Sequence, residues 1–329
     1  MKIPALFDHL SDLHVLVIGD VMLDTYCWGS VDRISPEAPV PVVSVKKTET
    51  RIGGAGNVAI NTAALGASTS IISVIGKDSA GEQLLQLMKA VPIQVGHVVV
   101  TPERPTTNKT RIMSRNQQML RLDQEETADL SIQAEELVWE QVQNYFSQQI
   151  PDVCILEDYN KGVLTSALIQ KILVLCKENR VITTVDPKKK NFFAYQGVTL
   201  FKPNLKEVRE GLNVTLTHID LVTLDAIHQQ LTERLHHQIS FITLSEKGVY
   251  YNDGTRSSWL PGHIRNIADV SGAGDTVIAV ASLVYAATSD MQTAAAIANI
   301  AGGLVCEEVG TAPIRKQLLL EETLRLLPV

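Results

Sequence analysis

The sequence of 329 residues predicts an α/β fold, in which a parallel β-sheet is flanked by helices and carries a small β-sheet lid. Short, wholly apolar runs that end in polar or charged residues are typical of buried parallel strands. These runs alternate with segments of helical length, as in consecutive βαβ units. Two further β stretches, at about 24–50 and 93–124, interrupt the alternation. Together they predict the lid, as insertions in one domain that spans residues 1–329.

The composition limits the class of protein. The formal net charge of −7 argues against a generic nucleic-acid binder, which needs a basic surface. No apolar run approaches the length of a transmembrane helix, and residues 1–10 lack the features of a secretory leader. The four cysteines are scattered without a CxxC pair, so neither a zinc site nor a redox pair is indicated. We therefore expect a cytoplasmic protein that binds neither nucleic acid nor membrane.

The first predicted strand, residues 15–18, runs directly into Gly19 and Asp20. Ligands of open parallel sheets lie beyond the carboxyl ends of the strands. Asp20 and the nearby Asp24 are therefore candidates for holding the hydroxyl groups of a polyol. A cap of the local turn explains Asp20 equally well.

Gly53 and Gly54 open a predicted helix of small residues that reaches residue 65. Glycines let the backbone approach a ligand closely, and Asn57 adds hydrogen-bond donors and acceptors at that point. A tight helix–sheet contact explains the glycines as well. The run 54–59 also approaches a dinucleotide-binding fingerprint, but no apolar strand leads into it, which argues against a nicotinamide-dependent dehydrogenase.

The second lid stretch is polar and contains four cations, which are Lys109, Arg111, Arg115 and Arg121. In an acidic protein such a cluster is suited to a substrate phosphate, which arginine binds in a bidentate manner. The neighbouring amides of residues 116–118 add neutral donors of the kind that bind sugars. A solvated strand face is the alternative interpretation.

Predicted strands at residues 153–156, 181–185, 200–202 and 239–244 continue the alternation in the second half of the chain. Each of them ends in polar or charged residues, as expected at the edge of a binding cleft. Asn204 and Glu207 follow one of these strands with the spacing of a capping box. That structural role accounts for both residues by itself.

Late in the chain, residues 272–274 read Gly-Ala-Gly, directly before Asp275 and an apolar helix. Glycines and the unpaired N–H groups of a helix start favour phosphate binding. Asp275 would then take a proton from a hydroxyl group while those N–H groups hold the anion. Considered alone, Asp275 is more simply a first-turn acid. Its combination with Gly53, Gly54 and the Asn204–Glu207 pair favours a catalytic base.

These motifs, in this order and at this spacing, resemble the ribokinase-like (PfkB) carbohydrate kinases across almost the whole chain. The resemblance implies a Rossmann-type parallel sheet with a β-sheet lid, ATP and Mg²⁺ as cofactors, and a sugar as the acceptor. Lid strands in this family often pair between subunits, which implies a homodimer. By motif, Asp275 is similar to the family's catalytic base. The residues similar to its anion hole are Gly272, Ala273 and Gly274.

The same resemblance assigns the remaining contacts. Asn204 and Glu207 are similar to the motif that holds Mg²⁺ through water, and Asp269 matches a position associated with a monovalent cation, K⁺, in several members. The residues expected beside ATP are Thr243, Ser245, Gly248 and Asn299. Those expected beside the sugar hydroxyl groups are Asp20, Gly53, Gly54 and Asn57. Charge alone selects the candidates for a substrate phosphate, which are Lys161 and Lys188 with Arg111 or Arg115.

A closer resemblance, at residues 19–24, 33–40, 114–118 and 158–162, is to bacterial heptose 7-phosphate kinases. It implies ATP-dependent phosphorylation of the anomeric hydroxyl of D-glycero-D-manno-heptose 7-phosphate to the 1,7-bisphosphate, on the route to ADP-heptose and lipopolysaccharide. Such kinases often occur fused to an adenylyltransferase domain, and because this chain ends at Val329 we expect that second activity to be absent. The alternatives are a PfkB kinase for another sugar or sugar phosphate, and a non-catalytic sugar-binding regulator.

Overall fold

The computed structural model describes residues 2–114, 117–216, 218–263 and 265–327. Its central layer is a nine-stranded sheet with the order β13-β12-β11-β10-β9-β8-β1-β4-β5. Neighbouring strands pair in parallel, except that β12 pairs antiparallel with both β11 and β13. The strands are β1 (His14–Gly19), β4 (Ser68–Gly76), β5 (Ile93–Thr101), β8 (Val153–Glu157), β9 (Ile182–Asp186), β10 (Leu200–Phe201), β11 (Ile239–Thr243), β12 (Val249–Asn252) and β13 (Ser257–Leu260).

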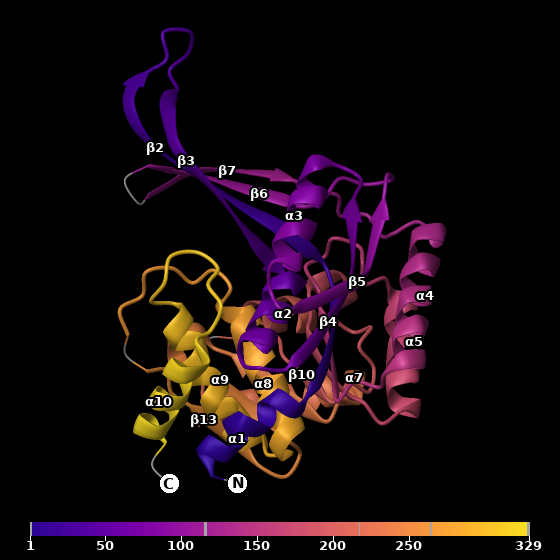
Figure 1. Cartoon of the computed structure of the whole chain (residues 1–329). Helices are drawn as coiled ribbons and strands as arrows, with labels where there is room; N and C mark the ends of the chain where they lie inside the picture. The colour runs from indigo at the N-terminus through magenta and orange to yellow at the C-terminus, as the bar shows by residue number, and fades with distance from the viewer. Residues whose placement is uncertain (1, 115–116, 217, 264, 328–329) are drawn as a thin grey trace.

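Helices cover both faces of this sheet (Figure 1). One face packs against α1 (Ile3–His9), α2 (Ala55–Ala64), α3 (Ser79–Lys89), α8 (Ala273–Thr288), α9 (Met291–Val305) and α10 (Lys316–Leu326). The other packs against α4 (Ile132–Gln148), α5 (Ser166–Glu178), α6 (Leu205–Leu212) and α7 (Leu221–Leu235). Short 3-10 helices are η1 (Leu10–Asp12), η2 (Lys189–Asn191) and η3 (Ser245–Lys247). The α/β fold predicted from the sequence is confirmed.

The alternation of side chains along β1 explains the two helical layers. Val15 and Val17 belong to the core on the α8 face, whereas Leu16 and Ile18 belong to the core on the α5 face. A strand points successive side chains to opposite faces, so a wholly apolar strand needs cover on both.

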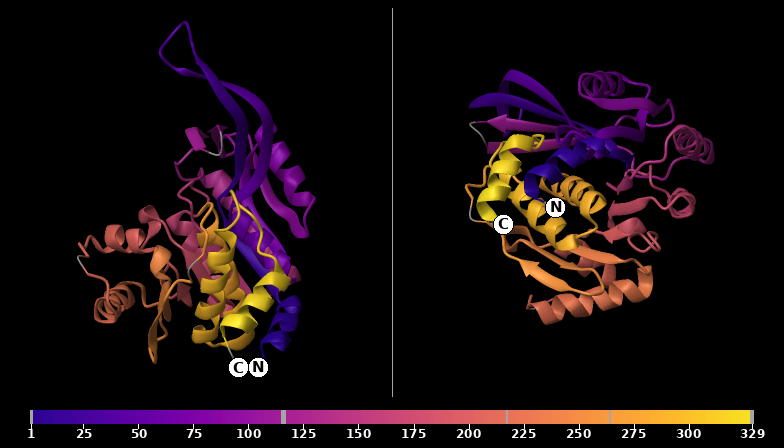
Figure 2. Two further views of the ribbon diagram at one scale, coloured as in Figure 1. Left: turned by 90° about the vertical axis from the view of Figure 1, so that its left-hand side faces the viewer. Right: turned by 60° about the horizontal axis from the view of Figure 1, so that its bottom comes forward.

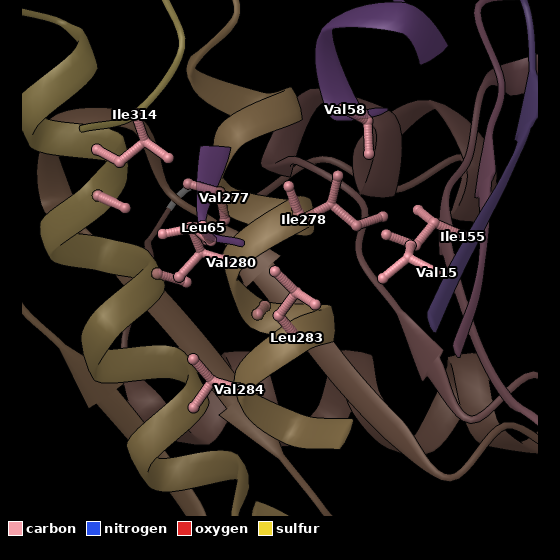
Figure 3. Close-up of a cluster of buried hydrophobic side chains, with 14 of the residues drawn as sticks. Val15, Val58, Leu65, Ile155, Val277, Ile278, Val280, Leu283, Val284 and Ile314 are labelled. Atoms are coloured by element: carbon pink, nitrogen blue, oxygen red, sulfur yellow. The ribbon is translucent and has the colours of Figure 1, made fainter. Parts of the chain in front are cut away.

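Helix α8 is buried along most of its length, with its apolar side chains packed toward β1, β8 and α2 (Figure 3). Ile278 and Leu283 are fully buried in this cluster. Burying a side chain of this size stabilises the fold by roughly 1.5–3 kcal/mol. This packing fixes the position of the first turn of α8, where Asp275 lies.

The lid is a separate four-stranded sheet with the order β3-β2-β6-β7. Its strands are β2 (Val21–Ile34), β3 (Pro41–Gly54), β6 (Asn108–Ser114) and β7 (Gln117–Gln124). The β2–β3 hairpin extends well beyond the body of the molecule in both Figure 1 and the left view of Figure 2.

The prediction that the second lid insertion spans about 93–124 was wrong in its first part. Strand β5 pairs in parallel with β4 and forms an edge of the central sheet. Helix α3 lies between the two strands in sequence, so β4-α3-β5 is one βαβ unit. The half-exposed pattern of β5 reflects its place at the sheet edge. Among the residues that the structure describes, no helix is both long and apolar enough to cross a membrane.

Candidate active site

The N-terminus of α8 is shaped by glycine. Gly272 caps the helix with φ = 79°, a left-handed conformation that glycine adopts without strain. A Cβ on Gly272 would lie 2.6 Å from Nδ2 of Asn57, so a larger residue would displace that amide. At Gly274 a Cβ would meet nothing closer than Oδ2 of Asp186 at 3.7 Å and Nζ of Lys202 at 3.9 Å. The turn of residues 272–274 therefore lies directly above a buried carboxylate–ammonium pair.

Asp275 is 3% exposed, and each of its carboxylate oxygens accepts a hydrogen bond. Asn57 Nδ2 donates to Oδ2 at 2.8 Å, and the Tyr159 hydroxyl donates to Oδ1 at 2.7 Å. Burial raises the pKa of Asp275 to about 6, although both hydrogen bonds lower it. A carboxylate with such a pKa is ionised at neutral pH and is a stronger base than an exposed aspartate.

Asp20 holds the loop that follows β8. Its oxygens accept hydrogen bonds from the backbone N–H groups of Tyr159, Lys161 and Val163 at 2.9–3.0 Å. The side chain is 1% exposed, and burial raises its pKa against these hydrogen bonds. These three backbone hydrogen bonds give Asp20 a structural role in the loop and favour another acid for contact with the sugar.

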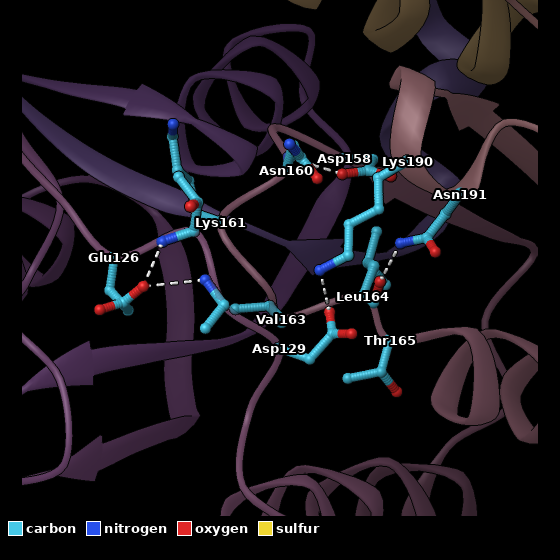
Figure 4. Close-up of polar contacts among 12 residues, drawn as sticks. Glu126, Asp129, Asp158, Asn160, Lys161, Val163, Leu164, Thr165, Lys190 and Asn191 are labelled. Carbon is cyan, nitrogen blue, oxygen red and sulfur yellow. Dashed lines mark hydrogen bonds and ion pairs between the residues drawn. The ribbon is translucent and has the colours of Figure 1, made fainter. Parts of the chain in front are cut away.

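The same loop is tied down at further points (Figure 4). Asp158 Oδ1 accepts from the backbone N–H of Asn160 at 2.7 Å. Asn191 donates to the carbonyl of Leu164 at 2.7 Å. The loop thus enters the site in one fixed conformation.

A chain of alternating charges runs beneath the turn of residues 272–274. Lys202 Nζ lies 2.7 Å from Asp186 Oδ2, Lys188 Nζ lies 2.9 Å from Asp186 Oδ1, and Lys188 Nζ also lies 2.7 Å from Glu207 Oε1. Burial alone would lower the pKa of Lys188, but Asp186 and Glu207 raise it above its ordinary value. Lys188 is therefore cationic at neutral pH, beside the proposed anion hole.

The capping box predicted for Asn204 and Glu207 is confirmed. Each side chain accepts a hydrogen bond from the other residue's backbone N–H, at 2.9 and 2.8 Å. Asn204 also forms an isolated parallel bridge with Thr243 at the end of β11. Ser245 and Gly248 follow in the turn between β11 and β12, with positive φ values of 56° and 93°. These residues all lie at the carboxyl edge of the sheet.

Asn299 is attached to a neighbouring loop. It lies on α9, and its Nδ2 donates to the carbonyl of Pro261 at 2.9 Å. Asp269 is likewise held by its surroundings, since it accepts from Ser271 N, Ser271 Oγ and Gly310 N at 2.8–2.9 Å. Within residues 2–114, 117–216, 218–263 and 265–327, no three His, Cys, Asp or Glu side chains converge as metal ligands.

The lid contributes an ion pair that the sequence reasoning did not combine. Arg111 on β6 pairs with Asp24 on β2, and Asp24 is 3% exposed. A Cβ on Gly53 would lie 2.2 Å from Asp24 Oδ2, and one on Gly54 would lie 2.3 Å from the Asp20 carbonyl. A side chain at position 53 would collide with the Asp24 carboxylate, and one at position 54 with the Asp20 carbonyl, so both positions require glycine. Arg111 was a candidate for the substrate phosphate, but its charge is already matched by Asp24.

The other residues predicted to bind the substrate phosphate lie in two different places. Lys188 lies with Asp186 and Glu207, as described above. Lys161 Nζ lies 2.7 Å from Glu125 Oε1 and close to Lys109 on β6. Burial, and next the charge of Lys161, lower the pKa of Lys109. Arg115 lies outside the described residues.

The sequence reasoning missed three residues of this site, which are Tyr159, Asp186 and Lys202. Asp186 did carry a signal, because it is an acid at the end of a predicted strand at the cleft edge. Tyr159 and Lys202 carried none, since an aromatic residue and a lysine beside apolar runs are ordinary. Only the pairing of β8, β9 and β10 brings them beneath α8.

Comparison with known proteins agrees with this geometry. The family model described as "pfkB family carbohydrate kinase" matches residues 12–317. The chain is 41% identical over 307 residues to bifunctional protein HldE of Desulfatibacillum aliphaticivorans, and 42% identical over 308 residues to the protein of that name from Methylobacillus flagellatus. These alignments cover 92% and 94% of the chain but only 62% of each relative.

Solved structures agree with the fold. Phosphofructokinase-2 of Escherichia coli in complex with substrates and products has a TM-score of 0.78 at 18% identity, over 94% of this chain and 98% of that one. Ribokinase of Arabidopsis thaliana complexed with ribose and ATP has a TM-score of 0.70 at 16% identity, over 94% and 99%. Because the family model spans nearly the whole sequence, the chain belongs to the pfkB family of carbohydrate kinases.

Proposed function

We propose that this protein transfers the γ-phosphoryl group of ATP to the anomeric hydroxyl of D-glycero-D-manno-heptose 7-phosphate, which gives the 1,7-bisphosphate used to make ADP-heptose. The observation that carries the proposal is buried Asp275, ionised and doubly hydrogen-bonded, next to the glycine turn at the start of α8. The choice of acceptor rests on the motifs at residues 19–24, 33–40, 114–118 and 158–162.

In the proposed reaction Asp275 removes the proton of the attacking hydroxyl group as its oxygen bonds to the γ-phosphorus. The bond from that phosphorus to the bridging oxygen breaks, and ADP leaves with the bonding electrons. The N–H groups of residues 272–274 and the Lys202 ammonium stabilise the negative charge of the transferring group. A general base contributes roughly 10²–10⁴ to the rate, and positioning and charge stabilisation supply the rest.

The nucleotide side of the site is proposed around the capping box of α6. Thr243, Ser245, Gly248 and Asn299 share the carboxyl edge of the sheet and would border ATP. Mg²⁺ is usually bound through one or two carboxylates together with substrate phosphates and water, and Glu207 at the start of α6 offers such a carboxylate. Glu207 is the carboxylate proposed to hold it through water, with Asn204 in support. Mg²⁺ would neutralise the charge of the phosphates.

The sugar side of the site is proposed between the lid and α2. Asp24 replaces Asp20 as the candidate for a sugar hydroxyl group, because it lies beside Gly53 on the lid strands. Asn57 would contact the hydroxyl nearest Asp275. Lys161 with Lys109 is proposed for the 7-phosphate, because two close and partly buried cations favour an anion between them.

Two further features remain proposals. Ile34, Val40 and Val45 on the extended hairpin are more than half exposed, which supports a homodimer through the lid. Light scattering of the wild type and of a variant with polar residues at these positions tests it. Asp269 is proposed for a monovalent cation, and substitution of Na⁺ for K⁺ in the activity assay tests that role.

The decisive experiment supplies the chain with MgATP and a panel containing heptose 7-phosphate, fructose 1-phosphate, fructose 6-phosphate, ribose and a nucleoside. ADP release gives kcat/KM, and ³¹P NMR identifies the phosphorylated position. We expect the highest kcat/KM for heptose 7-phosphate, with the new phosphate on the anomeric carbon. A clear preference for another acceptor would overturn the choice of sugar. Sugar binding without turnover of any acceptor would indicate a non-catalytic regulator.

A further inference from the structure

Tyr159 contacts the proposed base directly, yet neither the family motifs nor the proposed reaction gives it a role. Its hydroxyl donates to Asp275 Oδ1 at 2.7 Å, opposite the hydrogen bond from Asn57. Burial, and next the charge of Asp275, raise the pKa of Tyr159 well above its ordinary value. The phenol therefore stays protonated at every working pH and acts only as a donor.

The backbone of Tyr159 is held more firmly than that of an ordinary loop residue. Its N–H donates to Asp20 Oδ2 at 2.9 Å, and the same carboxylate binds the N–H groups of Lys161 and Val163. On the other side, Asp158 accepts from the Tyr195 hydroxyl at 2.8 Å. The position of the Tyr159 hydroxyl is thus set before any substrate arrives.

Two cations from different elements flank the ring. Nζ of Lys109, on lid strand β6, and Nζ of Lys188, after β9, each lie 5.3 Å from the ring centroid. Each such contact contributes roughly 0.5–2 kcal/mol, more when it is shielded from water. Both contacts therefore hold the ring in place, and its rotation away from Asp275 would break them.

We propose that Tyr159 is a positioning residue for the phosphoryl transfer, which fixes the orientation of the Asp275 carboxylate and keeps it ionised down to mildly acidic pH. This inference rests on the proposed function in taking Asp275 as the base. A hydrogen bond to the ionised form favours that form, so removal of the hydroxyl raises the pKa of the base. Tyr159 donates to Oδ1 of Asp275, whereas Oδ2 faces Asn57. A sugar hydroxyl that approaches Oδ2 from the Asn57 side would therefore leave the Tyr159 ring in place.

The other charges that face Asp275 do not replace this hydrogen bond. Asp186 raises the pKa of Asp275 and Lys188 lowers it. Glu157 lies in the same buried group, and burial raises its own pKa well above the ordinary value, which disfavours its charged form. Lys202 is bound to Asp186. Only Tyr159 and Asn57 donate directly to Asp275 among the described residues.

The test is Tyr159→Phe, with Tyr250→Phe as the matched control. Both variants remove a tyrosine hydroxyl that donates to an aspartate at 2.7 Å, but Tyr250 donates to Asp225 on α7 and only Tyr159 donates to Asp275. We expect the acidic limb of the kcat/KM profile of Tyr159→Phe to move up by about one pH unit. From a wild-type value of about 6, activity at pH 6 would fall about fivefold and activity at pH 9 would be nearly unchanged.

The control is expected to keep the wild-type profile, with a loss of thermal stability similar to that of Tyr159→Phe. A profile of Tyr159→Phe that coincides with the wild type would overturn the inference. So would a loss that is the same at all pH values and is also seen in Tyr250→Phe, because that is the signature of a structural role.

A second readout does not depend on activity. The Asp275 carboxyl resonance, in ¹³C-labelled protein and assigned with Asp275→Asn, reports the pKa of this group directly. An upward shift of that pKa in Tyr159→Phe supports the positioning role even if no acceptor is phosphorylated, in which case only the proposed function fails. An unchanged pKa overturns the positioning role even if the kinase assay succeeds.

Discussion

Replacement of Asp275 by asparagine is expected to lower the rate of phosphoryl transfer strongly while the protein stays folded. The substitution removes the carboxylate proposed to take a proton at the N-terminus of α8, and it keeps the size of the side chain. Loss of a general base lowers kcat by roughly 10²–10⁴, which corresponds to about 2.7–5.5 kcal/mol in activation free energy. We therefore expect a fall of at least about a hundredfold in kcat with little change in sugar affinity.

The structure predicts that the folded state survives this change. Asn57 and Tyr159 both donate to Asp275, so an asparagine amide must turn its NH₂ toward one of them, at a cost of roughly 1–3 kcal/mol. Against this, the pKa of about 6 lies about two units above that of an unfolded aspartate, so ionised Asp275 destabilises the native state by about 3 kcal/mol at pH 7. The two effects nearly cancel.

The sign of the pH dependence follows from the same shift. Between about pH 4 and pH 6 the folded protein retains a proton on Asp275 that the unfolded chain has lost, so wild-type stability falls as the pH rises through this window. Asp275→Asn lacks that fall. Denaturant unfolding at pH 4 and pH 7 measures the difference, and equal pH dependence in both proteins would contradict the assigned pKa.

Asp225 offers the matched control. Its carboxylate also accepts from a tyrosine hydroxyl and an asparagine amide, Tyr250 at 2.7 Å and Asn252 at 3.1 Å, but it lies on α7 without an adjacent glycine turn. Asp225→Asn is expected to keep the wild-type kcat. If Asp275→Asn retains more than about a tenth of the wild-type kcat in the ADP-release assay, the base is another group.

Four further predictions concern other positions in and around the proposed site. Gly272→Ala forces a side chain to φ = 79° and against Asn57, so it is expected to lose about 1–2 kcal/mol of stability together with activity. Gly274→Ala, which clashes with nothing, is expected to keep its melting temperature but lose kcat, and normal turnover would argue against the proposed anion hole. Glu157→Gln is expected to leave stability at pH 7 unchanged or raised, because burial raises the pKa of this carboxyl well above its ordinary value and so disfavours the charged form, and a large loss in denaturant unfolding would contradict that direction. Lys161→Ala is expected to weaken heptose 7-phosphate binding more than ATP binding in calorimetry, and equal effects would place Lys161 elsewhere.

The sequence predicted the central sheet because its buried strands are short, apolar and regularly spaced. It failed at β5, whose side chains are exposed in part like those of a lid strand. The pairing of β5 with β4, not its composition, makes it part of the central sheet. Likewise, local spacing sufficed for the capping box of Asn204 and Glu207, since both partners lie within one helical turn.

Contacts between distant residues could not be predicted in this way. Tyr159 and Asp275 are 116 positions apart, and Asp24 and Arg111 are 87 apart. Each pair forms because two strands or a strand and a helix meet at a particular register, which no short motif encodes. Lys202 shows the same effect, because the pairing of β9 with β10 places it against Asp186.

The hydrogen-bond partners of Asp20 and Asp24 distinguish these two acids. The two acids are four residues apart and follow the same apolar strand, so the sequence treats them alike. The chain leaves the central sheet after Gly19 and enters the lid at Val21, which puts Asp20 at the crossing point. There its carboxylate accepts from three backbone N–H groups of the Tyr159 loop, whereas the carboxylate of Asp24 accepts from the side chain of Arg111. A side-chain partner can rearrange when a sugar arrives, but three backbone donors cannot do so without moving the loop that carries Tyr159. Asp20 therefore holds that loop in place, and this difference is why Asp24 is the acid proposed for contact with a sugar hydroxyl group.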